Sequence, residues 1–465
     1  MSTTDKVLAA IDAGFDGSLA RLLEFLRLPS ISTDPAYRPH CRAAAEWLAA
    51  TLVDAGFEAE IRTTPGQPMV TGHAKDTAAG AAGPTVLFYG HYDVQPADPL
   101  DLWQAPPFEP FVETGPDGVK RIRGRGASDD KGQLMTFVEA CRAWRQVTGS
   151  LPLAVRLLFE GEEESGSPSL VPFLEAHRQD LQADLALVCD TTQWDADTPA
   201  IVTSLRGMVY EQVTIIGPSR DLHSGMYGGP ARNPINLLAR ILADLHDSDG
   251  RVTLPGFYDG VPETPEALKA QWRELGFDET AFLGEVGLSV PAGERDRSVL
   301  EKIWARPTCD VNGIWGGYTG EGSKTVIPSR ASAKVSFRLV GTQDPVRISK
   351  AFHDFVRSRL PADCTAEFWS RDGSPAISLP IDGREVARAR DALEAEWGRA
   401  PVMMGSGGSI PVVGHFKRLL GMDSLMIGFA LEDDQIHSPN EKYDLKSFHK
   451  GIRSWARVLG ALAGV

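Results

Sequence analysis

Short apolar runs alternate with helical patterns along the first 190 residues of the chain. Residues 5–28 and 41–55 carry apolar side chains three and four positions apart, which is the spacing of one helix face. Further apolar runs and helical patterns then follow one another. They are the runs 85–89, 153–159 and 184–189 and the helical patterns 133–147 and 170–177. Buried strands that alternate with helices predict a parallel α/β sheet.

The pattern changes near residue 205. Residues 208–216 alternate between apolar and polar side chains, which predicts a strand with one buried face. A helix, a strand, a helix and a strand are predicted downstream, at 233–245, 331–339, 345–360 and 364–369. Two strand–helix–strand halves predict a ferredoxin-like α+β domain. The charged, proline-rich residues 250–305 are expected to form an irregular insertion in it.

The α/β pattern returns after about residue 376, with a helical pattern at 383–397 and an apolar run at 424–430. A chain of 465 residues is also long enough for more than one hydrophobic core. We therefore expect a discontinuous α/β domain, residues 1–205 and 376–465, built on a mostly parallel sheet with helices on both faces. Residues 206–375 should form a second, inserted domain.

Composition narrows the classes of partner. The chain has 47 Lys and Arg against 62 Asp and Glu, a formal charge of −15, which argues against nucleic acid or an anionic membrane as the main partner. The five cysteines are scattered and form no C-x-x-C pair, as expected of reduced thiols in a cytoplasmic protein. No apolar run approaches the ~18 residues of a membrane helix, and residues 1–20 are not expected to be a secretory signal.

Metal-binding side chains follow four of the predicted strands. They are His91 and Asp93 after the run 85–89, Glu163 and Glu164 after 153–159, Asp190 after 184–189, and His437 after 424–430. A further candidate, Asp129, lies in a glycine-rich loop just before the helix 133–147. Because active sites of parallel α/β sheets form at the carboxyl ends of the strands, these side chains should lie together.

Each of these motifs has an ordinary structural interpretation when taken alone. A lone H-x-D is usually a turn, and an Asp before a helix is usually its N-cap. Their convergence on one sheet edge instead predicts a metal site. Imidazole and carboxylate without thiolate favour zinc, manganese or cobalt over calcium. So many ligands suit two ions that share a carboxylate, and the Glu163–Glu164 pair could supply one ligand and one general base.

The same residues lie in motifs that resemble the two-zinc metallopeptidases, a family that includes cytosolic nonspecific dipeptidase, carnosinase, acetylornithine deacetylase and succinyl-diaminopimelate desuccinylase. The motifs are LRLPSIS at 26–32, GHYDVQP at 90–96, GRGASDDKG at 124–132, EGEEESGS at 160–167, DLHSGMYGG at 221–229, KTVIP at 324–328, GGSIPV at 407–412 and HSPNEKYD at 437–444. The resemblance runs over about residues 20–460 and is nearest to the dipeptidase branch, through DLHSGMYGG and SFRLV at 336–340.

The resemblance implies a role for each candidate residue. His91 and Asp190 would bind one metal ion, Glu164 and His437 the second, and Asp129 would bridge them. Asp93 would orient His91, and Glu163 would be the general base. The lid residue His223 would reach the active site of a partner subunit. Three further residues would hold substrate: Thr325, Arg338 and Ser409.

The resemblance therefore implies hydrolysis of dipeptides by a water between two metal ions, with Glu163 as base, in a homodimer whose residues 206–375 form the lid and dimer contact. An N-acyl amino acid deacylase would use the same scaffold and chemistry. A non-catalytic binding or scaffold relative is a third alternative, but the intact ligand set and Glu163 argue against it. A glycosidase would not explain His91 and His437.

Overall fold

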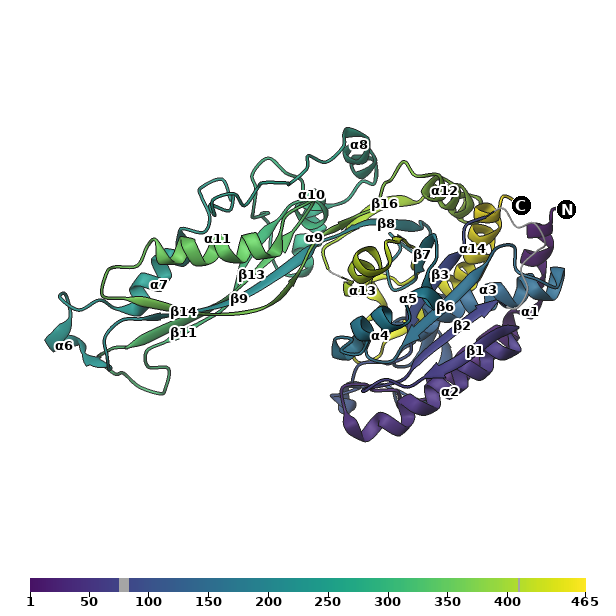
Figure 1. Cartoon of the computed structure of the whole chain (residues 1–465), viewed down its shortest axis with the longest axis horizontal. Helices are drawn as coiled ribbons and strands as arrows, with labels where there is room; N and C mark the ends of the chain where they lie inside the picture. Colours follow the sequence, from purple (N-terminus) through teal and green to yellow (C-terminus); the bar gives the residue numbers. More distant parts are fainter. Residues whose placement is uncertain (75–82, 409) are drawn as a thin grey trace. The chain divides into compact units, whose positions relative to one another are not determined.

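The computed structural model describes residues 1–74, 83–408 and 410–465, which form two compact units (Figure 1). The first unit contains Met1–Thr203, Leu379–Met404 and His415–Val465, and the second contains Ser204–Ser378 and Gly405–Gly414. The sequence analysis predicted two domains, residues 1–205 with 376–465 and residues 206–375. Independent folding of the two units stays a prediction. No helix among the described residues has the length and apolar character of a membrane span.

The main sheet is mixed, with a parallel centre. Its order is β1-β2-β6-β3-β7-β17-β8-β15, and β16 also pairs with β8. The strands are β1 (Phe57–Arg62), β2 (Met69–Ala74), β3 (Val86–His91), β6 (Val155–Glu160), β7 (Leu185–Val188), β8 (Ala200–Leu205), β15 (Ile377–Ser378), β16 (Val402–Ser406) and β17 (Asp423–Met426). The neighbours β6, β3, β7 and β17 are parallel, and the pairs on either side are antiparallel.

The α/β class is confirmed, but the antiparallel flanks were not predicted. All six side chains of β3 are buried, which explains its unbroken apolar run, because helices cover both faces of the central strands. By contrast, several side chains of β1 are exposed or only partly buried, so its sequence is only weakly apolar.

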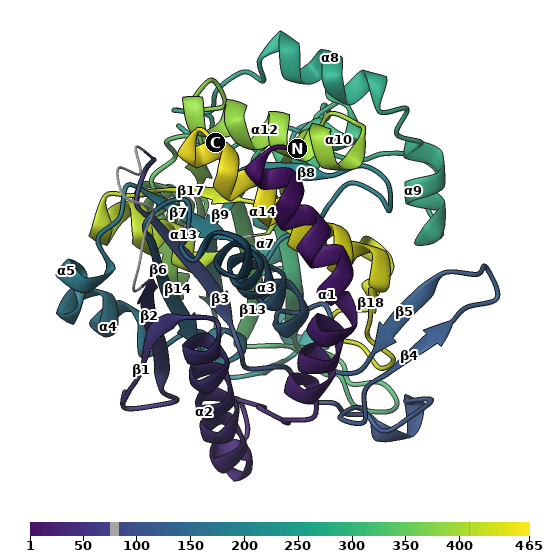
Figure 2. The same cartoon turned by 90° about the vertical axis from the view of Figure 1, so that its right-hand side faces the viewer.

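Helices pack on both faces of this sheet (Figures 1 and 2). On one side α1 (Thr3–Leu26), α3 (Lys131–Thr148) and α14 (Leu445–Ala463) contact one another, and α12 (Arg384–Trp397) packs on α14. On the other side lie α4 (Leu170–Ala176) and α5 (Arg178–Leu181), and α2 (Arg38–Asp54) packs along β1 and β2. A separate small sheet has the order β18-β5-β4, with β4 at Phe111–Thr114, β5 at Lys120–Arg123 and β18 at Lys442–Asp444.

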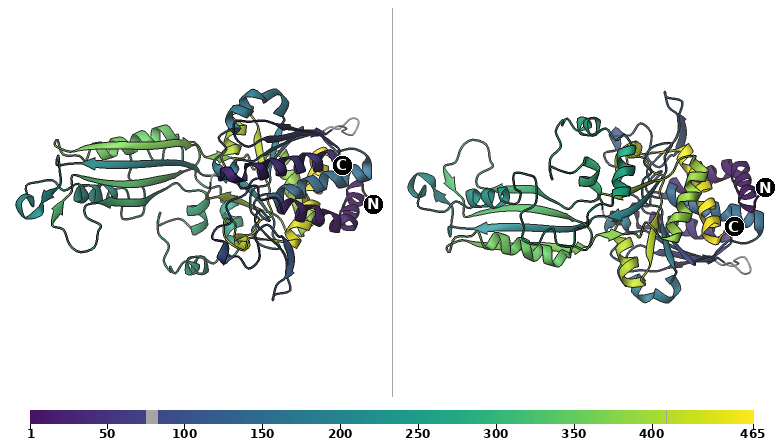
Figure 3. Two further views of the ribbon diagram at one scale, coloured as in Figure 1. Left: turned by 90° about the horizontal axis from the view of Figure 1, so that it is seen from below. Right: turned by 90° about the horizontal axis from the view of Figure 1, so that it is seen from above.

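The second unit has the β-α-β-β-α-β order of a ferredoxin-like domain. Its elements are β9 (Gly207–Ile216), α7 (Pro234–Ala243), β11 (Thr308–Gly316), β13 (Arg330–Leu339), α11 (Pro345–Arg357) and β14 (Thr365–Ser374). The four strands form an antiparallel sheet of order β11-β13-β9-β14. Both helices pack on one face of it (Figure 3). Alternate residues of β9 are buried, as the alternating pattern predicts.

The expectation of a wholly irregular insertion at 250–305 is wrong. It contains the short helices α8 (Glu266–Glu274), α9 (Glu279–Glu285) and α10 (Val299–Trp304). Helices this short show too few turns for a periodic pattern. Their capping residues are the clearer signal, because Asp278 accepts two backbone N–H groups at the start of α9 and Ser298 forms a capping box with Glu301 at α10.

The aromatic cluster beneath β3 should dominate the stability of the first unit. Phe88 stacks on Phe137 with ring centroids 3.8 Å apart and meets Trp455 edge-on at 5.7 Å. Phe88→Ala should lower the free energy of unfolding by about 3–5 kcal/mol, measured by urea unfolding, because the cavity cannot close in so packed a core. Phe111→Ala, where the ring is 38% exposed, is the matched control and should cost far less. If Phe88→Ala and Phe111→Ala lower the free energy of unfolding equally, then the aromatic cluster does not dominate the stability of the first unit.

Candidate metal centre

Strand register brings the predicted ligands to one edge of the main sheet. His91 is the last residue of β3, and its partner on β6 is Glu160, three residues before Glu163. On the other side of β3, Tyr89 pairs with Val188 of β7, so that His91 and Asp190 lie at the same level along the strands. The parallel alignment of β6, β3 and β7 therefore places side chains from three chain segments within reach of one another.

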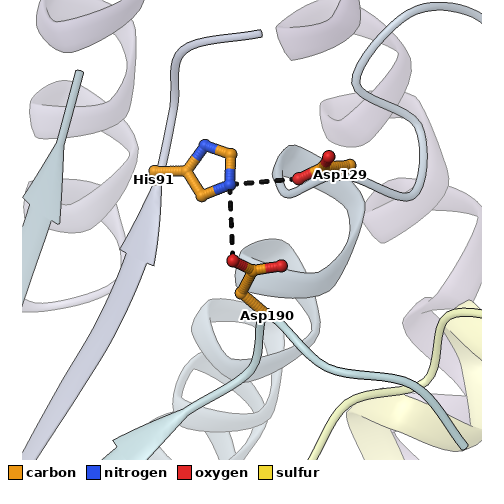
Figure 4. Close-up of side chains that lie close together, drawn as sticks. All are labelled: His91, Asp129 and Asp190. Carbon is orange, nitrogen blue, oxygen red and sulfur yellow. Dashed lines mark ion pairs between the residues drawn. The ribbon is translucent and has the colours of Figure 1, made fainter. Parts of the chain in front are cut away.

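The first group of side chains is His91, Asp129 and Asp190 (Figure 4). His91 Nε2 lies 3.1 Å from Asp129 Oδ1 and 3.8 Å from Asp190 Oδ2. The His91 side chain is only 1% exposed, and its Nε2 atom has no hydrogen-bond partner among the described residues. A buried ring nitrogen that faces two carboxylates in this way fits a metal ligand, because a divalent ion would satisfy all three groups.

The second group is Asp129, Glu164 and His437. His437 Nε2 lies 2.9 Å from Asp129 Oδ2 and 3.2 Å from Glu164 Oε2. Asp129 thus belongs to both groups and turns one carboxylate oxygen toward each imidazole. The donor set, imidazole and carboxylate without thiolate, fits two ions that share one carboxylate.

Asp93 ties His91 to the segment that carries the glutamates. Its Oδ1 atom lies 3.4 Å from His91 Nδ1, and its main-chain oxygen lies 3.1 Å from the same nitrogen. The carboxylate also accepts the backbone N–H groups of Glu163 at 3.3 Å and Glu164 at 3.1 Å. One fully buried side chain therefore fixes both the ring of His91 and the start of the short helix Glu163–Ser165.

Negative charge is crowded in this pocket. Burial and the nearby Asp129 carboxylate raise the pKa of Asp190 well above its usual range. Burial likewise raises the pKa of Glu163 to about 7, with help from Asp93 and against the effect of His91. Hydrogen bonds to Asp129 and Glu164 raise the pKa of His437 to about 10. The pocket is therefore short of positive charge, which divalent cations would supply while leaving the imidazoles neutral.

Three residues around the site escaped the sequence analysis. Gln95 donates to Glu164 Oε2 at 2.7 Å, and Asp130 accepts the backbone N–H of His91 at 3.0 Å. Glu441, in the segment that follows His437, accepts the backbone N–H of Asp129 at 3.1 Å. All three lie inside the motifs GHYDVQP, GRGASDDKG and HSPNEKYD. Asp130 and Glu441 contact backbone N–H groups, which no pattern of side chains marks, and Gln95 lies too far from Glu164 in the sequence for their spacing to indicate a contact.

The second unit holds three of the predicted substrate residues. His223 and Thr325 lie together, because His223 pairs with Val326 and Ser224 N donates to the Thr325 carbonyl oxygen at 3.0 Å. Arg338 lies on β13 and pairs with Met208 at the start of β9. Ser409 lies outside the described residues.

Arg338 forms no ion pair with any residue that the structure describes. Arg206 lies near it and donates to the carbonyl oxygens of Gly407 at 3.1 Å and Lys302 at 3.3 Å. Burial lowers the pKa of Arg206 to about 10, and the positive charge of Arg338 adds to this effect. Two guanidinium groups that interact in this way would be stabilised by an anion.

A profile of peptidase family M20/M25/M40 matches residues 87–461 of the chain. The Cys-Gly metallodipeptidase dug1 of Schizosaccharomyces pombe is 31% identical over 99% of this chain and 98% of its own. Two solved structures share the fold over nearly the full length. The M20 family metallo-carboxypeptidase Sso-CP2 of Sulfolobus solfataricus is 30% identical, with a TM-score of 0.80 over 96% of this chain and 99% of its own. Human carnosine dipeptidase 1 is 27% identical, with a TM-score of 0.76 over the whole of both chains.

These relatives confirm the resemblance found in the sequence, including its dipeptidase branch. The match also covers the segments that carry the two groups of metal-binding side chains. The chain belongs to the peptidase family M20/M25/M40.

Proposed function

We propose that this chain is a dinuclear metal-dependent dipeptidase. The observation that carries the proposal is the shared carboxylate of Asp129, whose two oxygens face His91 on one side and His437 on the other. The dipeptidases among its relatives support the substrate class. Zinc is the ion we assign, because imidazole with carboxylate is its usual catalytic donor set; manganese and cobalt bind the same donors.

His91, Asp129 and Asp190 would hold one ion, and Asp129, Glu164 and His437 the other. Two such ions would supply Lewis acidity, which polarises the peptide carbonyl and lowers the pKa of a water molecule. The water then loses a proton more easily and can attack the carbonyl carbon. Glu163 belongs to neither group, so its carboxylate is left to act as the base. It would take a proton from the water and return it to the leaving amine.

We also propose that the active enzyme is a homodimer in which His223 serves the partner's site. Within one chain, β13 runs from Arg330, which pairs with Ile216, to Arg338, which pairs with Met208. The eight residue-to-residue steps from Arg330 to Arg338 span about 27 Å, at ~3.4 Å per step. His223 lies beyond the Arg330 end, before the short helix α6 (Ser224–Tyr227) at the tip of the unit in Figure 1.

A dipeptide is only about 7 Å long. It therefore cannot touch His223 and Arg338 of the same chain. If both residues contact one substrate, then one of them comes from a second copy. The Nδ1 atom of His223 accepts a hydrogen bond from Gly225 N at 2.9 Å, so the ring proton lies on Nε2. The His223 side chain is exposed, and its Nε2–H group could donate a hydrogen bond that stabilises the oxyanion.

The substrate's free carboxylate would bind Arg338, with the neighbouring Arg206 adding positive potential. Thr325 and Ser409 would contact the rest of the substrate, as the family resemblance implies. All five cysteines are free and buried, which supports a cytoplasmic location for the protein.

Glu163→Gln should keep both metal ions but lower kcat at least ~100-fold, because it removes proton transfer and not ligation. Glu164→Gln should instead lose metal. Elemental analysis beside kcat separates the two effects, and Glu175→Gln, on the exposed face of α4, is the matched control. Loss of metal from Glu163→Gln, with retention in Glu164→Gln, would reverse the two assignments.

Asp93→Asn should weaken metal binding or activity by ~10–100-fold. The amide keeps one oxygen acceptor. Its NH₂ group would stand either in place of Oδ1, which faces His91 Nδ1 and accepts Glu163 N, or in place of Oδ2, which accepts Glu164 N. Metal affinity measured by competition with a chelator checks this. If Asp93→Asn binds metal and cleaves substrate like the wild type, then Asp93 does not orient His91 and is only a turn residue.

Mixing His223→Ala chains with Glu163→Gln chains should restore part of the activity that each lacks alone. In one of the two hybrid sites, an intact metal unit then meets an intact His223. Mixing Glu163→Gln with Glu164→Gln is the control and should restore nothing, because both defects lie in the metal unit. If mass spectrometry detects heterodimers but activity does not return, then His223 does not act across the dimer.

Amidating the C-terminus of a good dipeptide should lower kcat/KM by about 2–4 kcal/mol, or ~30–1,000-fold, because the amide cannot pair with Arg338. Arg338→Ala should harm the free acid far more than the amide. Arg330→Ala is the control, since that side chain lies exposed on the same strand.

Longer peptides and N-acyl amino acids complete this assay. Equal cleavage of amidated or longer peptides would favour a broader peptidase, as the metallo-carboxypeptidase relative suggests. Activity on N-acyl amino acids alone would favour the deacylase alternative.

A further inference from the structure

The loop that carries His437 has an unusual backbone. Three of its non-glycine residues, Gln435, His437 and Asn440, have φ angles of 56°, 62° and 65°. The left-handed region is unfavourable for such residues, so their surroundings must hold them there. Asn440 is held by its own side chain, which accepts Gln104 N at 2.7 Å and donates to the Leu102 carbonyl at 2.9 Å.

Glu441, at the end of this loop, is fully buried and accepts four hydrogen bonds. Its Oε2 atom accepts Arg125 Nη1 at 2.8 Å and the backbone N–H of Gly126 at 2.9 Å. Its Oε1 atom accepts the backbone N–H groups of Ser128 at 2.9 Å and Asp129 at 3.1 Å. A single carboxylate thus gathers the donors of the turn that ends in Asp129.

The start of the loop is attached to the same turn. Asp434, also fully buried, accepts Ser128 Oγ at 2.7 Å and the backbone N–H of Leu431 at 2.8 Å. Lys442 Nζ lies 2.8 Å from its other oxygen. Both ends of segment 434–441 are therefore fastened to the turn 125–129, with His437 between them.

The turn itself allows little adjustment. A Cβ on Gly132 would lie 1.8 Å from the Ala127 carbonyl oxygen, so the backbone closes on itself at this point. A change in the Glu441 contact would then shift the position of Asp129 relative to His437, since a tightly closed turn moves as one piece.

We propose that Glu441 is a positioning residue that sets the separation of His437 from Asp129 and so builds the second metal position. This rests on the proposed metal assignment. Only a carboxylate fits the role, because four donors converge on it. A glutamine has one oxygen, and its NH₂ group would oppose two of the four donors in a fully buried place.

Glu441→Gln should therefore bind the second ion at least ~10-fold more weakly than the wild type, while the first ion, whose other two ligands His91 and Asp190 form no hydrogen bond with Glu441, is retained. The measurement is zinc content per chain by elemental analysis, after dialysis against a series of buffered free zinc concentrations. His437→Ala is the reference for loss of the second ion. Glu432→Gln, an exposed change in the same region, is the matched control and should bind two ions like the wild type.

Circular dichroism and thermal melting of the metal-free proteins would show that Glu441→Gln is folded. Two ions bound with wild-type affinity would overturn the proposal, and so would equal weakening of both ions in a folded protein. If Glu441→Gln does not fold, then Arg125→Lys decides, because it removes one of the four donors to Glu441 and keeps the positive charge. That variant should also weaken the second ion selectively, and wild-type binding of both ions would overturn the proposal.

The proposed function fails in a different way. A wild-type protein that binds two ions but cleaves no dipeptide would contradict the dipeptidase assignment, while the zinc content of Glu441→Gln would still test its positioning role.

Discussion

The carboxylate of Asp129 faces two imidazoles at once, and the surrounding structure of the first unit holds it in that position. Its oxygens lie 3.1 Å from His91 Nε2 and 2.9 Å from His437 Nε2. A carboxylate is rigid and planar, so the distance between its two oxygens is fixed. The position of these oxygens relative to the two imidazoles then depends on how firmly the backbone of Asp129 is held. Asp93 fixes the ring of His91, and Glu441 fixes the peptide of Asp129. The geometry of the site is thus determined largely by hydrogen bonds to the backbone.

Crowded carboxylates have a cost that the rest of the fold must offset. Without cations, burial drives the pKa of Asp190 and Glu163 upward, which means that their charged forms are destabilised in the folded protein. The loop of His437 adds backbone strain to this cost. The aromatic core next to the site, where Phe88 contacts Phe137 and Trp455 three residues before His91, contributes burial that stabilises the same strand.

The sequence predicted those features that produce a local pattern. The central strand β3 appeared as an apolar run because both its faces are buried, and β9 alternated because only one face is buried. His91, Asp129, Glu164, Asp190 and His437, chosen from their positions after strands and from the family resemblance, do lie in two groups. The antiparallel flank of β1 and the helices of the insertion were missed, since partly exposed strands and helices of two turns carry little periodicity.

Glu441 could not have been assigned from the sequence alone for a different reason. Its partners are mainly backbone N–H groups, which every residue except proline possesses, so no pairing of side-chain types marks the contact. In a chain with 62 acidic residues, one more glutamate is also unremarkable by count. The converging donors become visible only when the backbone of turn 125–129 is known in three dimensions.

The residues proposed to bind metal and the residues proposed to bind substrate lie in different units. Every candidate metal ligand belongs to the first unit. The residues proposed to contact substrate, His223 and Arg338, belong to the second unit, where about 27 Å of β13 separates their surroundings. No rearrangement of a regular four-stranded sheet could bring its two ends within reach of one dipeptide. The proposed metal ligands therefore all come from one chain, whereas a substrate contact that uses both His223 and Arg338 would need two chains.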